Sequence, residues 1–186
     1  MITKENFDAL RIELSIKAKN GIDFIIAASI IWLAIAYIWT FPYTPYNKSI
    51  LTFIVGGLML PLALLLSKLL KTVWTIKDNP LQPLGLWLNF AQLFYFPFLV
   101  FALIKIPDYF VMVYVIITGA HFFPYAWYYK ISMYAVFAGI ISLGALLLGL
   151  KLPADKIYYI PLFMSANLII LGILLQANVK KRAASK

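Results

Sequence analysis

Six apolar runs, each long enough to cross a lipid bilayer as a helix, dominate this sequence of 186 residues. An α-helix rises about 1.5 Å per residue, so about 20 mainly apolar residues span the hydrocarbon core. The runs cover residues 22–41, 50–70, 84–104, 107–127, 133–150 and 158–178. We therefore expect an all-α fold, a polytopic membrane protein with six transmembrane helices, in which residues 1–186 form a single membrane domain.

The composition supports a membrane location and excludes several kinds of site. Hydrophobic residues make up 63% of the chain and charged residues 12%, and the mean hydropathy is +0.89. The chain has no Cys and one His, which argues against a disulfide framework, a thiolate metal site and a multi-histidine haem or metal site. We expect no metal and no cofactor. Catalytic motifs are also lacking, so we expect no enzyme, and an intramembrane enzyme is the least favoured alternative.

The distribution of basic residues predicts how the spans are oriented. Loops rich in Lys and Arg are retained in the cytoplasm. Of the 16 Lys and Arg, all but four fall on the side that holds both termini, and the exceptions are Lys48, Lys105, Lys151 and Lys156. Both termini are therefore expected in the cytoplasm. The net charge of +9 comes from residues beside the apolar runs and not from one patch, so the expected partner is the lipid bilayer and not a nucleic acid.

The two ends of the chain differ from the spans. Phe7, Leu10 and Leu14 recur at helical spacing among charged residues, which predicts a cytoplasmic amphipathic segment over residues 1–20. We expect a short helix over residues 3–19 that lies on the cytoplasmic leaflet, with a solvated tail as the alternative. A cleavable signal peptide is not expected, because the apolar run that follows has span length. Residues 179–186 are expected to form a basic cytoplasmic tail.

A sequence recurrence predicts an internal repeat. At a shift of 82 residues, FPYTPYNK at residues 41–48 aligns with FPYAWYYK at residues 123–130, with five of eight positions identical. Chance matching in a Leu-rich chain is the alternative explanation. Three spans per unit would place residues 22–104 and 105–178 in opposite orientations, as an inverted 3+3 repeat. Inverted repeats of this kind occur in transporters, with the substrate site near the bilayer midplane at the repeat interface.

Polar side chains inside the spans are the candidates for a site, because burying them in hydrocarbon is costly unless they find partners. They are Asn89 and Gln92 in the third span, Thr118, His121 and Tyr125 in the fourth, and Asn167 in the sixth. The depth of His121 in its span allows a hydrogen bond to Asn89 or Gln92. The set either lines a substrate or proton path or only joins neighbouring helices.

His121 is the most informative of these residues. It is the only side chain in the predicted spans whose ordinary pKa lies near neutrality, and Pro124 is expected to interrupt the helix beside it. Charged residues near the span ends, by contrast, are interpreted as anchors in the headgroup region, where carboxylates meet water and long side chains extend to it. These are Asp23, Lys68, Asp108 and Lys130.

Two stretches resemble a known protein family. NPLQPLGLWLNFAQLFYFPF at residues 79–98 and IITGAHFFPYAWYYK at residues 116–130 are similar to an uncharacterised family of small multi-pass integral membrane proteins of low-GC Gram-positive bacteria, classed as a domain of unknown function. The resemblance extends along almost the whole chain. It implies a bacterial cell membrane and a multi-span fold, and it assigns no catalytic or binding residue.

These observations favour one function and leave another open. The predicted repeat and the few polar residues at depth favour a small-solute transporter or channel. A non-catalytic protein that binds a lipid or a partner subunit is the alternative, favoured by an aromatic content of 17%. A homo-oligomer is compatible with either function. No sequence feature identifies the solute.

The predicted topology can be tested by cysteine labelling, because the chain contains no Cys of its own. Single cysteines at positions 45, 106 and 154 are expected to react with a membrane-impermeant maleimide from the outer side. Labelling of any of the three from the cytoplasmic side alone would contradict the topology.

Overall fold

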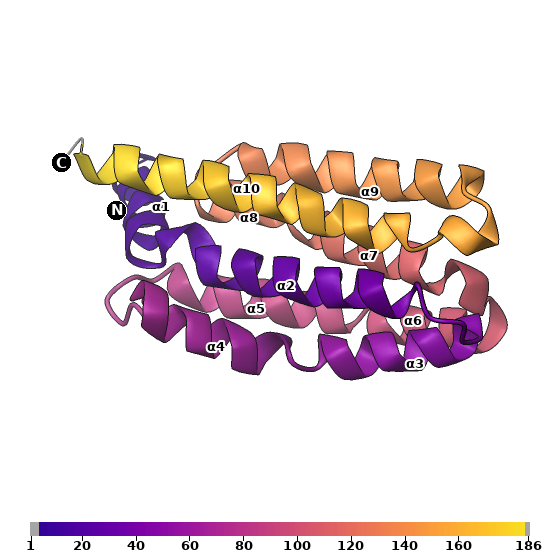
Figure 1. Ribbon diagram of the computed structural model, residues 1–186. Helices are drawn as coiled ribbons and strands as arrows, with labels where there is room; N and C mark the ends of the chain where they lie inside the picture. Colours follow the sequence, from indigo (N-terminus) through magenta and orange to yellow (C-terminus); the bar gives the residue numbers. More distant parts are fainter. Residues whose placement is uncertain (1–3, 185–186) are drawn as a thin grey trace.

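The computed structural model describes residues 4–184, and these form an elongated bundle of helices (Figure 1). The helices are α1 (Lys4–Lys17), α2 (Ile22–Ile38), α3 (Pro45–Gly56), α4 (Met59–Leu70), α5 (Gln82–Leu93), α6 (Phe96–Lys105), α7 (Phe110–His121), α8 (Phe123–Tyr128), α9 (Met133–Lys151) and α10 (Tyr159–Ala184). Three short 3₁₀ turns lie between them, at Lys19–Gly21, Pro107–Tyr109 and Ala154–Lys156. Among the described residues there is no strand, so the all-α prediction is confirmed.

Six stretches of the bundle are long and apolar enough to cross a membrane, which confirms the predicted number of spans. They are Lys19–Ile38, Pro45–Leu70, Gln82–Lys105, Pro107–Tyr128, Met133–Lys151 and Ala154–Ala184. Each overlaps one of the apolar runs in the sequence. The first and last described residues lie at the same end of the bundle, as an even number of crossings requires (Figure 1). We call this end the α1 end.

Three of the six spans are interrupted, and each interruption precedes a proline. The breaks fall at Gly57–Leu58, at Phe94–Tyr95 and at Phe122. Pro61, Pro97 and Pro124 follow them within the first three residues of α4, α6 and α8. Proline lacks an N–H donor, and its ring clashes with the carbonyl four residues earlier, so a straight helix cannot continue through it.

Most of the core lies between four helices, and the other two spans contribute less to it. Helix α2 packs along α10, and α7 packs along α9. Ile35, Val115 and Leu168 from three of these helices are fully buried. In contrast, only 17% of the most apolar window of α3–α4 and 11% of that of α5–α6 is buried. Their outward apolar side chains are suited to contact lipid, which is the solvent of a transmembrane surface.

Close packing of α7 on α9 depends on glycine. A Cβ atom on Gly119 would lie 2.5 Å from Cγ2 of Ile141, which is fully buried. Gly149 faces Met112 in the same way from the other helix. Small residues at these positions let the two backbones approach, as is common where helices pack in membranes.

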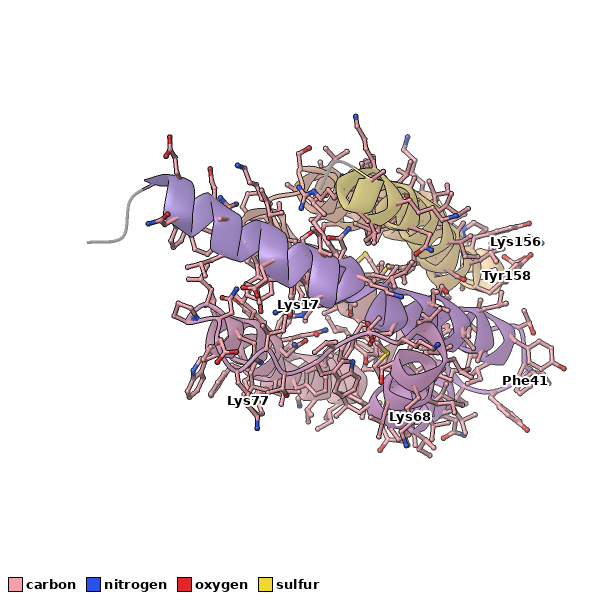
Figure 2. The ribbon with its side chains drawn as sticks, turned by 90° about the vertical axis from the view of Figure 1, so that its left-hand side faces the viewer. Lys17, Phe41, Lys68, Lys77, Lys156 and Tyr158 are labelled. Atoms are coloured by element: carbon pink, nitrogen blue, oxygen red, sulfur yellow. The ribbon has the colours of Figure 1, made fainter. Side chains whose placement is uncertain are left out.

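Helix α1 lies across the end of the bundle and packs on protein (Figure 2). The sequence predicted a helix here, and its apolar side was expected to face the leaflet. Instead Leu14 is only 1% exposed and belongs to the core, and the ring of Phe7 lies 5.4 Å from that of Trp127. The difference arises because the ends of α8 and α10 and the connection between α4 and α5 offer α1 a surface to pack on.

The two copies of the Phe-Pro-Tyr motif have different local structures. Residues 41–43 form an irregular connection, whereas residues 123–125 begin helix α8. The same shift of 82 residues aligns Gly57 with Gly139. Gly57 follows the end of α3, whereas Gly139 lies inside the continuous helix α9. The inverted repeat therefore stays a prediction.

The packing of α7 on α9 predicts a selective effect of glycine substitution. Gly119→Ala is expected to lower the free energy of unfolding by about 1–3 kcal/mol, the usual range for overpacking. Gly139→Ala is the matched control, because a Cβ there meets nothing within 4 Å. Thermal unfolding in detergent measures both variants. Equal melting temperatures for the two would contradict the close α7–α9 contact.

Candidate functional site

The polar residues expected in one group are only partly brought together. Gln92 Nε2 lies 3.4 Å from Thr118 Oγ1, which joins α5 to α7, and Thr118 Oγ1 donates to the carbonyl of Tyr114 at 2.9 Å. The ring of His121 lies 5.3 Å from that of Tyr125 in an edge-on contact. Two separate pairs thus form, Gln92 with Thr118 and His121 with Tyr125.

The expected hydrogen bond from His121 to Asn89 or Gln92 is not formed, and this corrects the sequence prediction. Asn89 Nδ2 donates instead to the carbonyl of Gly85, 2.9 Å away on its own helix. Asn167 Nδ2 does the same with the carbonyl of Phe163 at 2.8 Å. A carbonyl four residues earlier is always within reach of a helical Asn, so a local bond satisfies the amide without a second helix.

His121 and Tyr125 keep their polar atoms available. Among residues 4–184, no hydrogen bond involves the imidazole of His121 or the hydroxyl of Tyr125. Every buried side-chain nitrogen or oxygen of the described chain does have a partner. The polar atoms of these two residues are therefore not fully buried, and they lie next to the break between α7 and α8.

The structure places a second polar group at the α1 end, and Asp23 is its centre. Sequence analysis interpreted Asp23 as an anchor exposed to water, but it is only 1% exposed. Thr72 Oγ1 and Trp74 Nε1 donate to its Oδ2 at 2.7 and 2.5 Å, both from the connection between α4 and α5. Asp23 is buried because this connection folds back over the start of α2.

The turn before α2 is held by a buried asparagine. Asn20 and Gly21 adopt positive φ angles of 58° and 70°, a left-handed conformation that Asn and Gly tolerate best. Asn20 Oδ1 accepts from Ser15 Oγ at 2.5 Å, and its backbone carbonyl accepts from the hydroxyl of Tyr134 at 2.6 Å. Its Nδ2 donates to the carbonyl of Leu175 at 3.3 Å. The turn thus joins α1, α9 and α10.

Four tyrosines, from α8, from α9 and from the residue that follows α8, pack together beside this turn. The ring centroids of Tyr129 lie 4.7 Å from Tyr128 and 6.0 Å from both Tyr125 and Tyr134. The cluster connects the His121 pair to the α1 end, since Tyr125 belongs to both.

Charged side chains fasten α1 to the rest of the bundle. Asp8 pairs with Arg11 at 3.0 Å and with Lys130 at 2.7 Å. Arg11 Nε also donates to the carbonyl of Trp127 at 2.6 Å, and its guanidinium lies 4.9 Å from the centre of that ring. Arg182 near the end of α10 donates to Ser15 Oγ at 2.6 Å. The anchor position of Lys130 is therefore also an attachment point for α1.

Little in the sequence indicated this second group. The residues before the first span were interpreted as a surface helix, and one carboxylate at the start of an apolar run resembles an interfacial anchor. The Asn-Gly pair at residues 20–21 is the one local signal, because it marks a turn that needs positive φ angles.

Six helices that are long and apolar enough to cross a membrane are consistent with the class of multi-pass α-helical membrane proteins. Within this class the chain belongs to a family of unknown function, DUF7010, whose model matches residues 7–178. The match confirms that the chain belongs to an uncharacterised family. No curated protein and no solved structure matches the chain significantly.

The attachment of α1 predicts how an Asp8 variant behaves. The hydrogen bond from Lys130 lowers the pKa of the Asp8 carboxyl below its ordinary value. A carboxyl with a lowered pKa favours the folded state at neutral pH and loses that effect only as the pH falls through the lowered pKa. At pH 7, Asp8→Asn is thus expected to speed hydrogen–deuterium exchange in α1. Glu5→Gln, at an exposed position, is the control, and equal exchange in both variants would contradict the attachment.

Proposed function

We propose that the protein moves a small solute across a bacterial cell membrane, with both termini in the cytoplasm. The solute would bind where α7 gives way to α8. The observation that supports this is the pair His121 and Tyr125, whose polar atoms have no hydrogen-bond partner among the described residues and are not fully buried beside a helix break. Polar groups at such a depth are costly unless they serve a function or find partners.

The helix break adds backbone groups to this site. Pro124 has no N–H, so residue 124 cannot satisfy the carbonyl of Ala120 as it would in a continuous helix. In many transporters, discontinuous helices present such backbone groups to substrates or coupling ions. The interrupted spans α3–α4 and α5–α6 provide further positions at which the bundle can bend.

The neighbouring polar pair suggests how far the path extends. Gln92 and Thr118 lie about one turn of α7 from His121, toward the other end of the bundle. Asn89 lies three residues before Gln92 and therefore on the same side of α5, and its side chain is exposed. In this proposal Asn89, Gln92, Thr118, His121 and Tyr125 mark the path. Asn167 would join it only through the predicted inverted repeat.

A second candidate function is the binding of a lipid or a partner subunit. The low burial of α3–α4 and α5–α6 favours it, because these spans leave large apolar side chains such as Phe94 and Trp87 exposed. Lipid that copurifies in fixed stoichiometry, together with no flux of any solute, would favour this candidate over transport.

Flux measurements with His121 variants test the transport proposal. Purified protein in proteoliposomes is screened against a panel of small solutes, and the active solute is then measured with His121→Gln and His121→Leu. If His121 carries a proton, both variants are expected to lose at least about 90% of the flux, because neither can titrate near neutral pH.

Folding of the variants needs a separate measurement. Gel filtration and thermal unfolding establish that each variant is intact, and Tyr43→Phe, an exposed position at the other end of the bundle, controls for the effect of substitution. A His121→Gln protein with wild-type flux, beside a His121→Leu protein that is only less stable, would show that His121 merely packs between helices.

A further inference from the structure

Asp23 is a nearly buried carboxylate with no cationic partner. The ion pairs of the described residues involve Asp8, Glu13 and Asp155, and none involves Asp23. The basic residue nearest to it in sequence, Lys19, donates instead to the carbonyl of Leu70 at 2.6 Å. Two hydrogen bonds and its place in the first turn of α2 stabilise the carboxylate, and a counter-charge would stabilise it further.

Only one of the two Asp23 oxygens has hydrogen-bond partners. Thr72 and Trp74 both donate to Oδ2, and no described residue donates to Oδ1. Since the described chain contains no fully buried side-chain oxygen without a partner, Oδ1 is not completely enclosed. Oδ1 of this nearly buried carboxylate can therefore accept a further ligand.

The hydroxyl of Tyr129 also lacks a hydrogen-bond partner among the described residues. Tyr129 is 7% exposed, yet no described residue forms a hydrogen bond with its hydroxyl. The group points to the turn before α2, because a Cβ atom on Gly21 would lie 3.2 Å from the Tyr129 hydroxyl and 3.6 Å from that of Tyr134. Burial raises the pKa of Tyr129 well above its usual range, and neighbouring tyrosines and the charge of Asp23 add to the rise.

We propose that Asp23 and Tyr129 bind an alkali metal cation, such as Na⁺, at the α1 end of the bundle. Carboxylate and hydroxyl oxygens are the ligands that hard cations prefer. One carboxylate balances a single positive charge, which favours a monovalent over a divalent ion.

The cation would have a structural consequence. Asp23 is bonded to the connection between α4 and α5, and Tyr129 lies between α8 and α9. An ion held by both side chains would join these two segments to the start of α2. This site lies next to the proposed solute path, since the rings of Tyr129 and Tyr125 are 6.0 Å apart, but the cation proposal does not depend on transport.

Thermal unfolding of the full-length protein in detergent tests the site. NaCl replaces choline chloride stepwise at constant total salt. The melting temperature is followed by tryptophan fluorescence, which includes that of Trp74, the residue that donates a hydrogen bond to Asp23. Wild-type protein is expected to gain a few degrees with saturable dependence on Na⁺ and little with choline, because a ligand that binds only the folded state stabilises it.

Matched variants assign the effect to the proposed ligands. Asp23→Asn is expected to abolish the response to Na⁺, and Tyr129→Phe to weaken the apparent affinity about tenfold, as the loss of one ligand to a charged group would. Asp108→Asn and Tyr43→Phe, which change exposed residues elsewhere, are expected to respond as wild type does.

Two results would overturn the proposal. One is a wild-type melting temperature that depends on total salt but not on whether the cation is Na⁺ or choline. The other is a Tyr129→Phe protein with an unchanged response to Na⁺, which decides the question even if Asp23→Asn does not fold. Loss of flux in the same preparations would bear only on the transport proposal.

Discussion

The need to satisfy backbone polar groups inside a hydrocarbon solvent governs this structure. Water is absent from the core of a bilayer, so each N–H and C=O group of a span needs a partner within the protein. Where prolines interrupt the spans, some N–H groups donate to the carbonyl three residues earlier, as in a 3₁₀ turn, instead of four residues earlier. Tyr95 N donates to the carbonyl of Gln92 and Phe122 N to that of Gly119, each at 3.1 Å. These bonds satisfy part of the backbone at the bends, whereas the carbonyl of Ala120 has no donor at residue 124.

The same requirement explains why the polar side chains are unevenly distributed. Inside the spans, Asn89, Asn167 and Thr118 bond to carbonyls of their own helices. At the α1 end, Asn20 and Asp23 instead bond to residues far away in sequence. A polar side chain that bonds to its own helix places no requirement on the neighbouring helices. The side chains at the α1 end do, because their hydrogen bonds join α1, the start of α2, the connection between α4 and α5, α9 and α10.

Sequence reasoning therefore predicted the parts that depend on local chemistry. Apolar runs and prolines determine where helices form and break, and both are visible in the residues themselves. The burial of Asp23 and the docking of Leu14 depend on segments such as the connection between α4 and α5, whose course no local pattern reveals. The expected bond of His121 to Asn89 failed for a related reason. Depth along a helix shows which residues can meet, but it does not show which nearer partner an amide will take.

The pairing of α2 with α10 has a consequence for biogenesis. The first span leaves the ribosome well before the last, yet Asn20 completes its bonds only with the carbonyl of Leu175. Until α10 is inserted, the amide of Asn20 and the α2 surface that covers α10 must be held by lipid, by the insertion machinery or by transient contacts. A prematurely terminated chain would keep that surface permanently open, which gives membrane quality control a physical mark by which to tell unfinished molecules from complete ones.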